Sequence, residues 1–151
     1  MSALTMERLA PLMDEMNAWC MKGYPEEACG LVVETAGVLS AMCLENLQNK
    51  LHKLDPERYP RTAATAYNMD PRAFMKVDDA GGIVRAIFHS HPDRGAYFSD
   101  EDVLSALGGD PDGEPILPGV DYLVISARES GCDDAKLFSW DEAGHCFQER
   151  P

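Results

Sequence analysis

The segment from His89 to Asp102 constrains this chain more than any other part of its sequence. It follows an apolar run, Gly82 to Phe88, whose composition is typical of a buried strand. Because residues i and i+2 of a strand point to the same face, His89 and His91 are expected to project side by side from the strand end. Asp102 follows in the expected first turn of a helix. Two imidazoles and a carboxylate, with a fourth position open, are typical of a catalytic zinc site.

Parts of this segment also have an ordinary structural explanation. Ser99 followed by Asp102 has the form of a helix N-cap with an acid at the third helical position, which is close to a capping box. A pair of histidines two residues apart on a strand also arises by chance. The combination is more informative, because residues 92–98 are long enough to fold back and present the start of the helix to the histidines. The capping role and the metal-binding role are compatible.

A zinc site that activates water also needs a carboxylate to accept the proton. Glu26 and Glu27 stand just before residues 31–33, an apolar stretch that we expect to form a strand. If that strand lies beside the histidine strand, one of the two carboxylates can reach the metal. Neighbouring strand residues face opposite sides, so only one can do so, and the spacing does not choose between them. A solvated corner between helix and strand is the alternative for both.

The rest of the chain alternates between helical and strand patterns. Residues 4–22 carry apolar side chains at a 3–4 spacing, which predicts an amphipathic helix that ends at Gly23-Tyr24-Pro25. A hairpin is expected about Ala36-Gly37, and residues 46–66 are expected to form an irregular loop. Further helices are expected at residues 70–80 and 99–107, and further strands at 38–44, 66–69, 82–88, 121–127, 135–140 and 145–149.

This order predicts an α+β fold, a sandwich in which helices flank a mixed β-sheet, as a single domain over residues 1–151. The chain carries 13 Lys and Arg residues against 26 Asp and Glu residues, a net charge of −13. That balance argues against nucleic acid or an anionic membrane as a partner.

Cysteine usage and the absence of targeting signals suggest a cytoplasmic protein. The five cysteines are odd in number and form no closely spaced pair, so most are expected to be buried thiols in a reducing compartment. The first residues show no signal-peptide pattern, and no apolar stretch approaches the about 20 residues that span a membrane.

The pattern Glu27-x-x-Gly30, followed downstream by His89-x-His91-x7-Ser99-x-x-Asp102, resembles the motif of the JAMM (MPN) zinc peptidases at every signature position. The resemblance extends from residues 24–30 to residues 121–126. It is strongest to small bacterial members, including peptidases that act on ubiquitin-like sulfur-carrier proteins, some of which release cysteine from the carrier C-terminus. The fold implied is the MPN-like, or cytidine-deaminase-like, sandwich.

The resemblance implies a role for each motif residue. His89, His91 and Asp102 would bind Zn²⁺ with water as the fourth ligand. Glu27 would be the general base and later the proton donor to the leaving amine, which leaves Glu26 as a solvated neighbour. Ser99 would bond the tetrahedral intermediate or orient its neighbours. The expected function is hydrolysis of a peptide or isopeptide bond at the C-terminal tail of a ubiquitin-like β-grasp protein, which could bind as an added strand at a sheet edge.

Three alternatives are weaker. A metallo-β-lactamase-like hydrolase would need a histidine where Arg94 stands, and a cupin would need a glutamate and a later histidine at other spacings. A non-catalytic MPN interaction module would lack the metal ligands, which this chain keeps. A deconjugating isopeptidase stays open. Residues 46–66 depart from the family by their length, and the sequence does not define the carrier or the oligomeric state.

Overall fold

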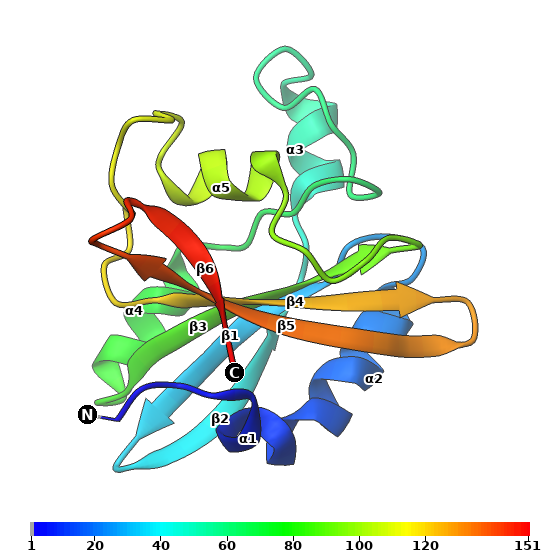
Figure 1. Ribbon diagram of the computed structural model, residues 1–151. Helices are drawn as coiled ribbons and strands as arrows, with labels where there is room; N and C mark the ends of the chain where they lie inside the picture. The colour runs from blue at the N-terminus through cyan, green and yellow to red at the C-terminus, as the bar shows by residue number, and fades with distance from the viewer. Residues whose placement is uncertain (1) are drawn as a thin grey trace.

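The computed structural model describes residues 2–151 and contains an open, mixed sheet (Figure 1). Its strands are β1 (Cys29–Thr35), β2 (Val38–Leu44), β3 (Ile83–Pro92), β4 (Asp121–Arg128), β5 (Gly131–Asp141) and β6 (Cys146–Arg150). Their order across the sheet is β2-β1-β3-β4-β5-β6, with β3 and β4 parallel and the other neighbours antiparallel. The predicted α+β class with a mixed sheet is therefore confirmed.

The predicted helix at residues 4–22 forms as three consecutive pieces. These are α1 (Met6–Leu9), a 3₁₀ turn η1 (Ala10–Leu12) and α2 (Met13–Gly23). Pro11 lies in the 3₁₀ turn, and it has no backbone N–H with which to continue the α-helical ladder. Thr5 caps the first piece, because its hydroxyl accepts a hydrogen bond from the Arg8 N–H at 3.1 Å. As predicted, the helix ends where residues 23–25 begin to turn.

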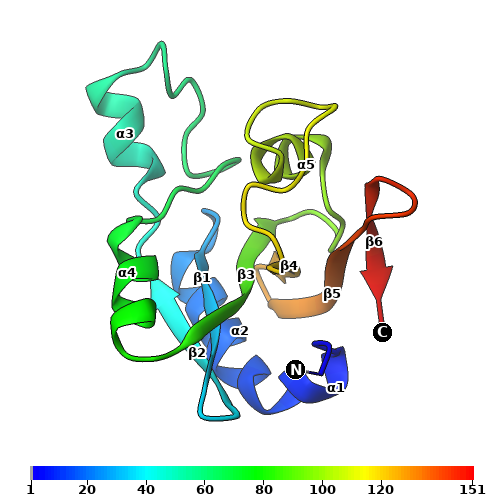
Figure 2. The same cartoon turned by 90° about the vertical axis from the view of Figure 1, so that its left-hand side faces the viewer.

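Helices cover both faces of the sheet, as Figure 2 shows. The face covered by α1 and α2 holds the larger core cluster, to which Phe88 and Ala86 of β3 contribute. The opposite face is covered by α4 (Arg72–Asp79) and α5 (Asp100–Ala106), and Ile87 packs there. Successive strand residues point to opposite faces, so His89 lies on the same face as Ile87 and α5. None of the helices in residues 2–151 has the length and apolar character to cross a membrane.

The segment predicted as an irregular loop, residues 46–66, instead begins with a helix, α3 (Gln48–Leu54). Asn46 explains this start, because its side-chain oxygen accepts hydrogen bonds from the N–H groups of Gln48 at 3.0 Å and Asn68 at 3.1 Å. Leu47 also donates its N–H to the Asn68 carbonyl at 2.7 Å. The strand predicted at residues 66–69 does not form, since Asn46 and Leu47 rather than a strand ladder bond the backbone there.

The other predicted strands are confirmed: β2 has the predicted bounds, β6 is shifted by one residue, and β1, β3, β4 and β5 are longer than predicted. β3 continues through both histidines to Pro92 because β4 runs beside it, pairing His89 with Val124 and His91 with Ser126. On the other side β1 pairs with β3, so that Cys29 lies opposite His89. The histidines therefore belong to the sheet's centre and not to a loop after it.

Gly30 of β1 is a point of close contact that explains the glycine of the motif. A Cβ atom added there would lie 2.4 Å from the backbone oxygen of Met42 and 2.4 Å from a ring carbon of Phe88. The backbone oxygen belongs to the paired strand β2 and has no room to move. We therefore expect Gly30→Ala to lower the free energy of unfolding by about 1–3 kcal/mol, the usual cost of overpacking, in urea denaturation.

Gly95→Ala is the matched control, because a Cβ there meets only a Tyr97 ring carbon at 3.7 Å, an ordinary contact. Its effect should be smaller than about 1 kcal/mol. Equal unfolding free energies for Gly30→Ala and the wild type would show that the Phe88 ring does not press on β1.

The cysteines should differ sharply in reactivity. Cys20 and Cys29 are fully buried, and burial raises the pKa of both thiols to about 12, whereas Cys146 is exposed. The thiolate is the reactive form, so at about pH 8 iodoacetamide should modify Cys146 first and the buried pair only after unfolding. Peptide mass spectrometry over time measures this. Modification of Cys29 at the rate of Cys146 would contradict the closed packing of β1.

Candidate metal centre

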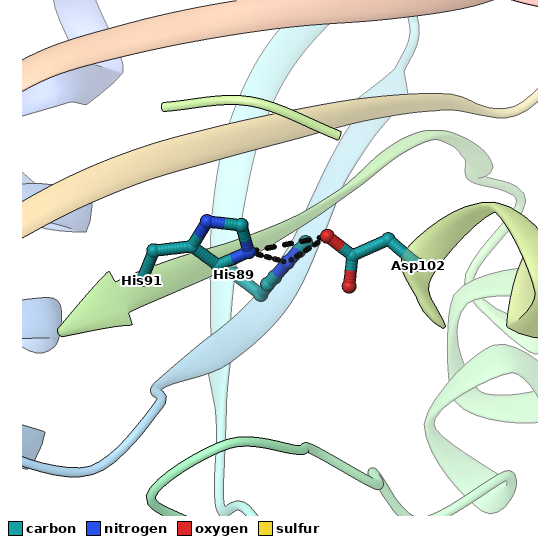
Figure 3. A group of neighbouring side chains, drawn as sticks. All are labelled: His89, His91 and Asp102. Atoms are coloured by element: carbon teal, nitrogen blue, oxygen red, sulfur yellow. Dashed lines mark hydrogen bonds and ion pairs between the residues drawn. The ribbon is translucent and has the colours of Figure 1, made fainter. Parts of the chain in front are cut away.

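The predicted ligands His89, His91 and Asp102 come together on the face of the sheet that α5 covers (Figure 3). The Nε2 atoms of the two histidines are 3.2 Å apart. The Oδ2 atom of Asp102 lies 3.2 Å from Nε2 of His89 and 3.1 Å from Nε2 of His91. Both imidazoles are buried, and the carboxylate side chain is 11% exposed. The structure thus places side by side the three ligands that the sequence suggested.

The three atoms that converge have lone pairs to offer a cation. The Gly95 carbonyl lies 3.0 Å from Nδ1 of His91, and because a carbonyl only accepts, this nitrogen carries the proton. In neutral His91 the Nε2 lone pair is then free and aimed at the Asp102 oxygen and at His89. Ligands about 2.0–2.1 Å from a tetrahedral zinc ion are about 3.3 Å apart. The observed separations of 3.1–3.2 Å fit that geometry.

Local structure fixes each predicted ligand. Ser90, between the two histidines, accepts a hydrogen bond at its hydroxyl from the Ala28 N–H at 2.8 Å and donates its own N–H to the Ala28 carbonyl at 2.9 Å. These bonds hold β3 to the segment before β1. On α5 the predicted capping box is present: the Ser99 hydroxyl accepts from the Asp102 N–H, and Asp102 Oδ2 accepts from the Ser99 N–H, both at 3.1 Å. The oxygen that faces the histidines is therefore also the capping oxygen.

The two histidine rings are further held by tyrosines. Tyr67 stacks on His89 with ring centroids 4.5 Å apart, and Tyr97 meets His91 edge-on at 5.0 Å. Nδ1 of His89 is buried without a hydrogen-bond partner among residues 2–151, so stacking rather than a hydrogen bond orients that ring. The tyrosines form walls on two sides of the centre.

Two opposing effects act on the carboxyl of Asp102. Burial is the largest single effect and raises its pKa, but hydrogen bonds from protonated His89 and His91, together with their positive charges, outweigh burial and hold the pKa well below its usual range. The carboxylate is therefore ionised, which is the form that binds a metal ion.

The structure distinguishes between the two adjacent glutamates. Glu27 is 3% exposed, whereas Glu26 is exposed and accepts a hydrogen bond from Asn49 at 2.6 Å. Burial raises the pKa of Glu27, while the charges of His89, His91 and Arg94 act to lower it, and that of Asp102 acts to raise it further. Glu27 is thus the carboxylate that lies within electrostatic range of the three predicted ligands.

Two residues near Glu27 were missed by sequence reasoning. Nη2 of Arg94 donates to Oε2 of Glu27 at 2.7 Å. The side-chain amide of Asn46 donates to the Glu27 carbonyl at 2.8 Å, and the Glu27 N–H donates to the carbonyl of Ala63, also at 2.8 Å. The backbone of Glu27 is therefore fixed by the segment predicted as a loop. Neither contact has a sequence signature, because each joins residues far apart in the chain.

Comparison with known proteins identifies the family to which the chain belongs. The family model of prokaryotic homologues of the JAB domain matches residues 9–140. The CysO-cysteine peptidases of Mycobacterium tuberculosis and Mycobacterium bovis are each 28% identical over 124 residues, which is 80% of this chain and 72% of theirs.

Solved structures resemble the fold. A solution structure of a Desulfitobacterium hafniense protein aligns with a TM-score of 0.60 and 27% identity, covering 99% of this chain and 90% of that one. A Salinibacter ruber protein aligns at 0.57 and 21% identity, over 91% of this chain and 86% of its own, and supports the fold alone. The chain belongs to the prokaryotic homologues of the JAB domain, and the resemblance to the JAMM (MPN) family is confirmed.

Zinc should stabilise the folded protein through these ligands. At a free zinc concentration about 100 times the dissociation constant, we expect the melting temperature of the metal-free wild type to rise by about 5–10 °C. His89→Ala should lose this rise together with the bound zinc, read by elemental analysis. His52→Ala should keep both, because His52 lies in α3 and bonds the Tyr59 carbonyl instead. An equal rise in His89→Ala would place the zinc elsewhere.

Proposed function

We propose that this protein is a zinc-dependent peptidase that hydrolyses a peptide or isopeptide bond at the C-terminal tail of a ubiquitin-like, β-grasp sulfur-carrier protein. The observation that carries the proposal is the convergence of His89, His91 and Asp102 within 3.2 Å of one another, near a buried glutamate. The similarity to the mycobacterial CysO-cysteine peptidases supports the choice of substrate class.

His89, His91 and Asp102 would hold the ion. When bound, zinc supplies Lewis-acid chemistry, which polarises a carbonyl and lowers the pKa of a water molecule to about 7. Glu27 accepts the proton of the attacking water and passes it to the leaving nitrogen. Its burial suits this role, since a carboxylate short of solvent is a stronger base than one in water.

Ser99 has a hydroxyl proton to offer beside the same centre. Its oxygen accepts the Asp102 N–H as a helix cap, which leaves its own O–H free to donate. A hydroxyl that donates to the oxygen of the tetrahedral intermediate would stabilise the charge that develops there. The capping contact also keeps this hydroxyl and the Asp102 carboxylate at a fixed distance from one another.

The substrate tail needs a route to a centre that lies in the middle of the sheet. β3 is flanked by β1 and β4, so a tail cannot reach the histidines as an added strand on β3 itself, and β2 and β6 are the sheet edges. A cavity of about 190 Å³ instead lies between residues 58–68 and the start of α5, where Asp102 forms part of its wall. We infer that the tail enters along this cavity in an extended conformation.

Two other functions give different results in the same assay. A deconjugating isopeptidase would release an intact protein from a lysine side chain, and a non-catalytic interaction module would bind a partner without cleavage. The ionised Asp102 and the buried Glu27 favour catalysis over the interaction module.

Zinc-loaded wild type should shorten sulfur-carrier proteins from the same source that carry one or more residues after their C-terminal tail, with the cleaved bond read by intact-protein mass spectrometry. Glu27→Gln, a neutral substitute of the same shape, should fold and bind zinc but cleave about 100- to 10,000-fold more slowly. Cleavage by Glu27→Gln at the wild-type rate would remove Glu27 from the mechanism. No cleavage by the zinc-loaded wild type of any tail-extended or lysine-linked carrier would refute the peptidase function.

A further inference from the structure

We propose that Arg94 binds the free α-carboxylate of a single amino acid at the substrate's C-terminus, and so selects the terminal peptide bond over an isopeptide bond. This inference rests on the proposed peptidase function and defines its substrate. Arg94 is a specificity-determining residue in this proposal, distinct from the metal ligands and from the base.

The guanidinium of Arg94 uses only part of its hydrogen-bonding capacity within the described residues. One of its five N–H groups, on Nη2, bonds Oε2 of Glu27 at 2.7 Å, and no other bond from this side chain is found among residues 2–151. The side chain is 30% exposed, while the Glu27 side chain is 3% exposed. One end of the guanidinium therefore contacts the proposed base, and the rest is open to a ligand. Its planar fork of donors matches a carboxylate.

The backbone around Arg94 is firmly held. The Asp93 N–H donates to the Ala127 carbonyl at 2.8 Å, and the Ser126 hydroxyl donates to the Arg94 carbonyl. The Tyr24 hydroxyl donates to the Asp93 carboxylate at 2.7 Å. These contacts anchor residues 93 and 94 to β4 and to the end of α2, so the guanidinium is presented from a fixed point. A pre-organised donor loses less freedom when it binds a ligand.

The chemistry of hydrolysis places a carboxylate within reach of Arg94. Water's oxygen forms the new bond to the carbonyl carbon, the C–N bond breaks, and the proton held by Glu27 passes to the leaving nitrogen. That nitrogen must then lie within about 3 Å of the Glu27 carboxylate. In a terminal amino acid the carboxyl carbon is two bonds from the same nitrogen. The α-carboxylate therefore lies close to the Arg94 guanidinium, which already touches Glu27.

An isopeptide bond does not place a carboxylate there. Its leaving nitrogen is the ε-amine of a lysine. The carboxyl group of that lysine forms a peptide bond, and the whole side chain separates it from the leaving nitrogen. Charge complementarity points the same way, since Arg94 is a cation beside the proposed base. We therefore assign the leaving group to an amino acid with a free carboxylate.

The test compares two substrates that differ only at the terminal group: a carrier with one added C-terminal residue as the free acid, and the same carrier as the carboxamide. Zinc-loaded wild type should cleave the acid about 10- to 100-fold more efficiently, judged by kcat/KM. Arg94→Gln should lower this ratio towards one. Arg94→Lys keeps the positive charge without the planar guanidinium, so it should keep part of the preference for the acid. Because cleavage of both substrates depends on Glu27 to the same extent, a change in the basicity of Glu27 in these variants should not alter the ratio.

Arg58→Gln is the matched control. Arg58 lines the cavity from the wall opposite Asp102 and forms no ion pair with Glu27, so its loss should leave the ratio of acid to amide cleavage unchanged. A ratio that falls in Arg58→Gln but not in Arg94→Gln would overturn the assignment and move the carboxylate site to the cavity. Equal cleavage of acid and amide by the wild type would also overturn it.

A second readout does not depend on catalysis. With the metal removed by a chelator, the tail peptide as the free acid should bind the wild type about 10-fold more tightly than its carboxamide, and Arg94→Gln should bind both equally. Equal binding by the wild type would contradict the inference. Cleavage of both substrates at equal rates leaves the peptidase function standing and removes only the role of Arg94, whereas failure to cleave any substrate removes both.

Discussion

The position of β3 between β1 and β4 is the constraint on which the whole site depends. Pairing with β4 extends the strand through both histidines, and pairing with β1 brings the segment that carries Glu27 alongside them. Phe88, one residue before the first histidine, is buried in the main core, so the strand cannot slide without losing that packing. A one-residue slip would turn both imidazoles to the opposite face of the sheet. Core packing and ligand direction are thus set by the same register.

Much of the site could be predicted from local sequence because its residues follow local rules. Alternation along a strand places His89 and His91 on one face, and the serine-to-aspartate spacing at the start of α5 defines a capping box. The capping box does two things at once, since the oxygen of Asp102 that caps the helix is the one that faces the histidines. The sequence therefore offered a structural and a chemical explanation of that residue, and in the structure a single oxygen of Asp102 has the position that both require.

What the sequence did not define depends on contacts between distant segments. The choice between Glu26 and Glu27 depends on which of the two side chains turns towards β3. Sequence spacing alone does not determine this. Asn46 and Arg94 bond Glu27 across 19 and 67 residues of chain, which no periodicity encodes. The helix α3 was missed because its start is defined by the side chain of Asn46, and the strand expected at residues 66–69 is absent because the same side chain bonds its backbone.

The two bonds that hold the backbone of Glu27 come from the two ends of the segment between residues 46 and 63, and not from its tip. Asn46 and Ala63 are the anchoring residues, while residues 53–58 at the tip are exposed. The proposed base is thus held independently of the exposed tip, of which Arg58 lines the cavity. A different tip grafted onto these anchors would reshape one wall of the cavity without moving the Glu27 carboxylate.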